Sequence, residues 1–170
     1  QVHTFGPRIM STRLRVKDQR GRPLVLYVVS AYAPLASAPQ AERDRYFSDL
    51  QKCCDACNER EVLILGTDAN AALGIKRFKQ DRVLGNHGVH HTNNAGGETY
   101  QFLARNELCS PSTFARNTTR NGSERYATWH HPGNGRGYQN DHFFLRQRDR
   151  KRVRKAVRWS GEMGASSDHM

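Results

Sequence analysis

No apolar run in this sequence of 170 residues approaches the roughly 18 residues that a membrane-spanning helix needs. The sequence also lacks an initiator methionine and the apolar core of a signal peptide at its start. We therefore expect a chain that begins inside a longer reading frame. We also expect an intracellular protein, nuclear or cytoplasmic, that is not secreted.

Acidic residues are in short supply too, because 16 Asp and Glu stand against 27 Lys and Arg, which leaves a net charge of +11. A surplus of this size favours a polyanionic partner, with nucleic acid first and an anionic membrane surface second. Solubilising charge without any partner is the alternative. Hydrophobic residues make up only 36% of the chain, so we expect a thin core or an incomplete domain.

Cysteine is scarce as well, with Cys53, Cys54, Cys57 and Cys109 as the whole set. Cys54 and Cys57 have C-x-x-C spacing, but a second such pair, or a histidine pair at ligand spacing, is missing. The first three cysteines fit the buried face of a helix. We expect free packing thiols, which are typical of a reducing compartment.

What the sequence does contain is a central apolar run, VLIL at residues 62–65, followed closely by Asp68 and Asn70. Such a run predicts a strand buried on both faces, and polar side chains just beyond it lie where α/β proteins bind ligands. If the extended backbone continues through Asn70, both side chains face one cleft. An Asx turn that closes the strand is the alternative.

Periodicity predicts the other elements. An antiparallel hairpin is expected from strands at residues 8–16 and 24–30, with Tyr32 just past the second strand. A helical stripe over residues 39–60 then leads to the central strand, which makes a crossover unit if the two flanking strands are parallel neighbours. Residues 76–94 read as a polar surface loop and residues 98–108 as a helix. Further strands are expected at residues 112–115, 126–130 and 139–145.

Basic residues gather at residues 147–159, and they include Arg150, Lys151 and Arg152. A solvated face and a phosphate-contact patch are both compatible with this density. We take these three side chains as candidate phosphate contacts.

Five short motifs follow one another in an order that matches a known family. They are SAYAP at residues 30–34, GTDAN at 66–70, ATW at 127–129, NDHF at 140–143 and SSDH at 166–169. In these motifs and their spacing the chain resembles the endonuclease/exonuclease/phosphatase superfamily. Within it, the likeness is to endonuclease domains of LINE-type non-LTR retrotransposons and related craniofacial-development-protein-like genes. The likeness extends over nearly the whole chain.

The resemblance implies an α/β fold of two packed mixed β-sheets flanked by helices, the DNase I-like four-layer sandwich. Residues 1–170 would form a single partial domain that is incomplete at its N-terminus. The implied reaction is hydrolysis of a DNA phosphodiester with Mg²⁺ or Mn²⁺.

The resemblance also implies roles for individual residues. Asp68 would orient or deprotonate the attacking water, and Tyr32 would donate a hydrogen bond to the phosphate. Asp141 and His169 would form a carboxylate–imidazole pair, and Asp168 would bind the metal. The implied contacts to substrate are Asn70, Asn94 and Trp129. The basic candidates Arg150, Lys151 and Arg152 would add to these contacts.

Several positions depart from the family pattern. The opening strands that supply an asparagine and a metal-binding glutamate are absent, and Leu35, Ala69, Asn140 and His142 replace the usual residues. We therefore expect a fragment or decayed copy with weak or no nuclease activity. The alternatives are a non-catalytic basic domain that binds nucleic acid, and a phosphatase or phosphodiesterase acting on a small or lipid phosphate. The sequence leaves DNA against RNA, target preference and oligomeric state open.

Overall fold

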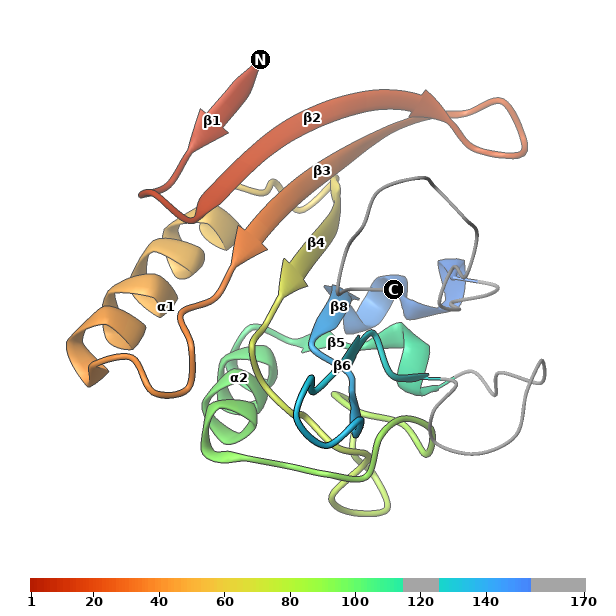
Figure 1. Ribbon diagram of the computed structural model, residues 1–170. Coiled ribbons are helices and arrows are strands. Elements are labelled where there is room, and N and C mark those ends of the chain that lie inside the picture. Colours follow the sequence, from red (N-terminus) through yellow and green to blue (C-terminus); the bar gives the residue numbers. More distant parts are fainter. Residues whose placement is uncertain (115–125, 154–170) are drawn as a thin grey trace.

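The computed structural model describes residues 1–114 and 126–153. Six strands form one mixed sheet in the order β1-β2-β3-β4-β8-β5, and β6 and β7 form a second, two-stranded sheet (Figure 1). This confirms the expected α/β class with two sheets. The strands are β1 Val2–Thr4, β2 Ile9–Lys17, β3 Pro23–Tyr32, β4 Val62–Asp68, β5 Leu108–Cys109, β6 Trp129–His130, β7 Gly137–Tyr138 and β8 Asp141–Arg146. The α-helices are α1 Gln40–Asp55 and α2 Asn94–Arg105, and the 3-10 helices are η1 Pro111–Thr113 and η3 Gln147–Arg152.

The predicted hairpin is present as β2 and β3, which stay in antiparallel register from the Ile9–Ala31 pair to the Lys17–Pro23 pair. Asp18 closes the turn between them, because its Oδ1 accepts the backbone N–H groups of Arg20 and Arg22 at 2.8 and 2.9 Å. The side chain thereby replaces backbone partners that a tight turn cannot supply.

The crossover unit is also confirmed. α1 lies between β3 and β4 in the sequence, and these two strands pair in parallel. The helix ends at Asp55, short of the expected residue 60, because residues 58–61 form a turn in which the backbone N–H of Asn58 donates to the Glu61 carboxylate at 2.9 Å. All four cysteines are free and buried. Burial raises the pKa of Cys54 to about 12, so this side chain remains a packing thiol.

Alternation along the strands gives the large sheet two different faces. Tyr27, Val29, Leu65 and Phe144 share one buried core with side chains of α1 and α2. The opposite face of β2 carries Met10, Leu14 and Val16, which are 52%, 47% and 36% exposed. Side chains alternate along β3, and Val29 and Ala31 face the core. The next side chain, that of Tyr32, therefore lies on this opposite face.

The second helix begins at Asn94, whereas the sequence predicted a start at Glu98. The glycines of this segment suggest a turn, yet Gly96 serves close packing: a Cβ on it would lie 1.9 Å from the carbonyl oxygen of Ala72. Asn93 caps the helix, since its side-chain oxygen accepts the N–H of Gly96 at 2.8 Å.

Two predicted strands are wrong in part. Residues 112–115 were expected to be extended, but η1 occupies residues 111–113, where the hydroxyl of Thr113 donates to the carbonyl of Ser110 at 2.7 Å. The strand expected at residues 126–130 is reduced to β6, which pairs only with β7. Short polar runs of this kind carry too few residues for periodicity to separate a strand from a turn.

The loop over residues 76–94 is not confined to the surface, because Val83 and Leu84 belong to the core. Asp81 makes this possible. Its carboxylate accepts the backbone N–H groups of Arg77, Val83 and Leu84 at 2.9 to 3.1 Å, which satisfies amide groups that would otherwise be buried without partners.

Candidate functional site

Three of the predicted site residues lie side by side across the main sheet. Tyr32 at the end of β3 is paired with Asp68 at the end of β4, and Asp68 is paired with Asp141 at the start of β8. Paired residues on adjacent strands project from the same face and stand about 5 Å apart. The fold therefore brings a phenol and two carboxylates, from distant parts of the sequence, into one row. We call Tyr32, Asp68 and Asp141 the catalytic row, because the sequence resemblance implies catalytic roles for them.

The backbone turns sharply just after this row. Asn70 has a left-handed φ of 44°, and its N–H donates to Asp68 Oδ1 at 3.0 Å. This is the Asx turn, which is the second of the two alternatives that the sequence left open, so the extended backbone does not continue through Asn70. The Asn70 amide group donates to the carbonyl of Ala33 at 2.8 Å and thereby joins the segments that follow β3 and β4.

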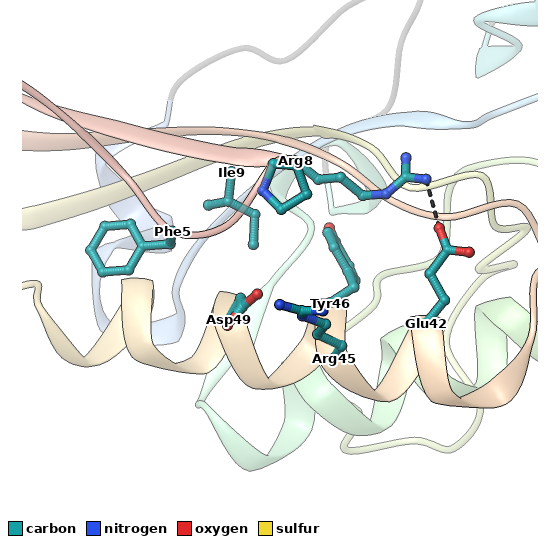
Figure 2. A pocket seen from close by; sticks show the side chains of 8 residues that line it. Phe5, Arg8, Ile9, Glu42, Arg45, Tyr46 and Asp49 are labelled. Carbon is teal, nitrogen blue, oxygen red and sulfur yellow. Dashed lines mark hydrogen bonds and ion pairs between the residues drawn. The ribbon is translucent and has the colours of Figure 1, made fainter.

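An arginine that the sequence did not single out lies beside Tyr32. The backbone N–H of Tyr32 donates to the carbonyl of Arg8 at 3.0 Å, and the Arg8 guanidinium lies 5.6 Å from the centroid of the tyrosine ring. The same guanidinium forms an ion pair with Glu42 on α1 at 2.6 Å (Figure 2). Hairpin register was the one signal that could have found Arg8, because Ile9 faces Ala31.

Thr128 is a second residue that the sequence did not single out, although it lies in the ATW motif. Its hydroxyl oxygen accepts the backbone N–H groups of Asn140 and Asp141 at 3.1 and 3.0 Å, and so it fixes the first residue of β8. The neighbouring Trp129 lies in β6, where its ring approaches that of Tyr138 at 5.8 Å. Trp129, which the sequence predicts to contact substrate, thus lies in a hairpin that directly precedes β8.

The predicted contact Asn94 is the first residue of α2 and is exposed. Asn93, the cap before it, is the residue that ties this end of α2 to the site. Its side-chain oxygen accepts the N–H of Ala72 at 3.1 Å in addition to that of Gly96. The start of α2 is therefore held against the segment that follows Asp68.

His142 follows Asp141 but faces the other way, into the core. Burial lowers its pKa to about 4, and its Nε2 lies 2.9 Å from the carbonyl oxygen of Gln139, which requires a proton on Nε2. The ring also stacks on Phe144 with 5.5 Å between centroids. His142 is thus a neutral core residue and is not a base for the catalytic row.

The structure does not bring the basic candidates to the catalytic row. They lie in η3, which follows the far end of β8, and a strand of six residues is about 20 Å long. Arg152 pairs with the buried Asp149 at 2.7 Å, and Arg150 lies 4.3 Å from the ring of Phe114, while Lys151 is exposed. Part of the predicted phosphate-contact patch is therefore engaged within the fold.

Asp168 and His169 lie outside the described residues. Within residues 1–114 and 126–153, no group of three or more His, Cys, Asp or Glu side chains could hold a metal ion. The two carboxylates of the catalytic row are the oxygen donors that Mg²⁺ prefers, so the type of donor fits, and the described part of the chain contributes two of them.

Comparison with solved structures identifies the fold of this chain. The chain has the DNase I-like fold, with a TM-score of 0.58 to the catalytic domain of Xenopus laevis APE2 and 0.54 to the 3'-5' exonuclease NExo of Neisseria meningitidis. Both are 16% identical, and the chain covers 47% and 60% of them, respectively, with 85% and 89% of its own length. At this level of identity the likeness is one of fold.

In sequence, the chain is similar to craniofacial development protein 2. It is 30% identical to the Bos taurus protein over 165 residues and 29% identical to that of Tragulus javanicus. These alignments use 97% of this chain but only 27% and 28% of the relatives, so the chain spans about a quarter of their length. No family model matches the chain. None of its described helices is both long and apolar enough to cross a bilayer.

Proposed function

We propose that this chain carries part of a site that hydrolyses phosphodiester bonds in nucleic acid, with DNA as the first candidate substrate. The observation that supports this most is the catalytic row, in which a phenol and two carboxylates occupy the ends of three neighbouring strands. The solved structures with the same fold include a 3'-5' exonuclease, which supports the choice of reaction class.

Each member of the row has a chemical task in this proposal. Asp68 accepts a hydrogen bond from the attacking water and orients it toward phosphorus. The Tyr32 hydroxyl, on a side chain that is half exposed, donates to a phosphate oxygen on which negative charge increases in the transition state. Asp141, fixed by Thr128, would orient the imidazole of His169 as the sequence resemblance implies.

Mg²⁺ or Mn²⁺ bound beside Asp68 and Asp141 would supply charge neutralisation at the phosphate. Because Leu35, Ala69, Asn140 and His142 depart from the family pattern, we propose that this chain alone has weak or no activity. The retrotransposon endonuclease assignment is the finer proposal, and it rests on the motif set. An intracellular, reducing location is proposed from the four buried free cysteines.

Nicking of supercoiled plasmid tests the proposal. We would assay the chain with Mg²⁺ and with EDTA, together with Asp68→Asn and His169→Ala variants. Asp44→Asn is the matched control, because this carboxylate is exposed on α1 and accepts a hydrogen bond from the side chain of Gln40. Slow nicking that requires Mg²⁺, Asp68 and His169 but not Asp44 supports the proposal. Nicking that survives Asp68→Asn would contradict it.

A non-catalytic domain that binds nucleic acid is the second candidate, and the net charge of +11 with the exposed Lys151 favours it. Plasmid retardation on a gel at low salt without nicking would support this candidate. Lys151→Glu should then weaken retardation, whereas Lys17→Glu, at an exposed site in another segment, and Asp141→Asn should leave it unchanged. Lys151 suits the test because Arg152 has a structural role against Asp149.

A further inference from the structure

A short loop between β4 and α2 carries an exposed aromatic ring among several cations. We call residues 76–82, KRFKQDR, the basic loop. Phe78 is 56% exposed, and the loop has four exposed basic side chains, which are Lys76, Arg77, Lys79 and Arg82. Among the described residues, none of these four forms an ion pair. The ring of Phe78 therefore lies on a positively charged surface.

The basic loop has a fixed backbone, although it is neither a helix nor a strand. Asp81, its single acid, is buried, and its carboxylate accepts three backbone N–H groups and the hydroxyl of Tyr100 at 3.1 Å. The N–H of Asp81 donates to the carbonyl of Phe78 at 3.1 Å, which closes a turn. The Arg77 guanidinium lies 4.0 Å from the centroid of the Tyr100 ring. The negative charge is thus turned inward, and the outer surface of the loop is positive and already ordered.

The basic loop lies at the same end of the main sheet as the catalytic row. The chain leaves β4 at Asp68 and passes through the Asx turn to this yellow-green segment beyond the end of the strand (Figure 1). Leu73 pairs with Thr92 in an isolated bridge, which joins the approach to the loop to the segment before α2. The loop is therefore a separate contact region at the end of the sheet that carries the row.

An exposed aromatic ring beside several cations suits single-stranded nucleic acid. Proteins that bind single strands let bases stack on aromatic side chains while basic side chains follow the phosphates. Bases inside a duplex are already stacked on both faces, so a stack on Phe78 requires an unpaired base or a strand end. The cations alone would fit any polyanion, whereas the ring favours a polyanion that carries bases.

We infer that the basic loop binds an unpaired segment of nucleic acid, with a base stacked on Phe78 and phosphates held by Lys76, Lys79 and Arg82. Arg77 contributes charge but is held against Tyr100. The inference specifies the form of the nucleic acid, and it rests on the proposed function in taking nucleic acid as the partner. It requires no hydrolysis by the catalytic row.

Binding of a short fluorescent oligothymidylate tests the inference. The titration is done in EDTA, which removes the metal that hydrolysis would need. Phe78→Leu keeps an apolar side chain but removes the ring, and it should weaken binding roughly tenfold. Met10→Leu, at a site on β2 that is 52% exposed, is the matched control and should not change the affinity. Polyphosphate, a polyanion without bases, should bind equally to the unchanged chain and to Phe78→Leu.

Two further variants separate stacking from charge. Phe78→Trp should keep the affinity, and oligothymidylate should quench its fluorescence more than that of the unchanged chain, which has two tryptophans. Lys79→Gln should reduce the slope of log affinity against log salt by about 0.7, which corresponds to one phosphate contact with a single strand. Lys17→Gln, at an exposed site on β2, should leave this slope unchanged.

The inference would be overturned by full affinity of Phe78→Leu for oligothymidylate, or by an equal loss of its affinity for polyphosphate. The absence of additional quenching in Phe78→Trp, or an unchanged salt slope in Lys79→Gln, would overturn it as well. Binding that depends on Phe78, without nicking that depends on Asp68, would refute only the proposed function. Nicking that depends on Asp68, without binding that depends on Phe78, would refute only the role of the basic loop.

Discussion

Acidification from pH 7 to pH 5 should destabilise this protein through His142. Burial lowers the pKa of this imidazole to about 4, from an ordinary value of 6.5. As the pH falls through 6.5, the unfolded chain binds a proton at this position, whereas the folded protein does not until about pH 4. The stability that depends on the neutral ring is therefore complete above about pH 6.5 and is lost as the pH falls toward 4.

The two pKa values determine the size of the effect. Linkage predicts a loss of about 2 kcal/mol in the free energy of unfolding between pH 7 and pH 5. The Nε2–H bond to Gln139 opposes this loss only in part, because Nδ1 has no hydrogen-bond partner among the described residues. A proton added to Nδ1 would place an unpaired charge in the core.

Urea unfolding at pH 7, 6 and 5 measures the loss. The test variant is His142→Phe, because an aromatic ring of similar shape can keep the stacking on Phe144. The control is His90→Gln, which alters an exposed histidine. We expect the unchanged chain and His90→Gln to lose about 2 kcal/mol and His142→Phe to lose little of it. An equal pH dependence in His142→Phe would refute the reasoning.

Two further predictions concern contacts that shape the site. Gly96→Ala should lower the free energy of unfolding by about 1–3 kcal/mol or more, because its Cβ would lie 1.9 Å from the carbonyl oxygen of Ala72. Gly97→Ala, where a Cβ meets nothing within 4 Å, should instead stabilise the helix by about 0.5–1 kcal/mol, and thermal unfolding of both variants would show whether the order is reversed. Thr128→Val should cost about 1–3 kcal/mol in urea unfolding, because two N–H groups lose their acceptor, while Thr128→Ser should cost less than half as much; equal losses would mean that the hydroxyl is unimportant.

The opposing predictions for Gly96 and Gly97 show where sequence interpretation ended. In the sequence the two glycines look alike and suggest a turn. In the structure they are consecutive helical residues. Gly96 lies against a backbone segment more than twenty positions away, whereas a Cβ on Gly97 would meet nothing within 4 Å. Local pattern cannot distinguish them, because the contact that matters is long-range.

The basic segment gives the same lesson at a larger scale. Its charges were plain from the sequence, and so were the three residues of the catalytic row. The sequence did not show how far the basic segment lies from the catalytic row. In the structure, Asp141 stands at one end of β8 and η3 follows the other end. The paired roles of Arg8 and Glu42 were equally hidden, since an ion pair across 34 positions leaves no periodic signal.

The sequence by itself determined the elements whose information is local: the hairpin of β2 and β3, the crossover through α1 to β4, and the chemical identity of Tyr32, Asp68 and Asp141. Apolar periodicity and turn residues are sufficient for these, since each depends on neighbours within one element. Only the tertiary structure decided which residues meet. Strand register aligned the catalytic row, and the hydrogen bond from Tyr100 to Asp81 joined the basic loop to α2, because both depend on contacts between segments that the sequence keeps apart.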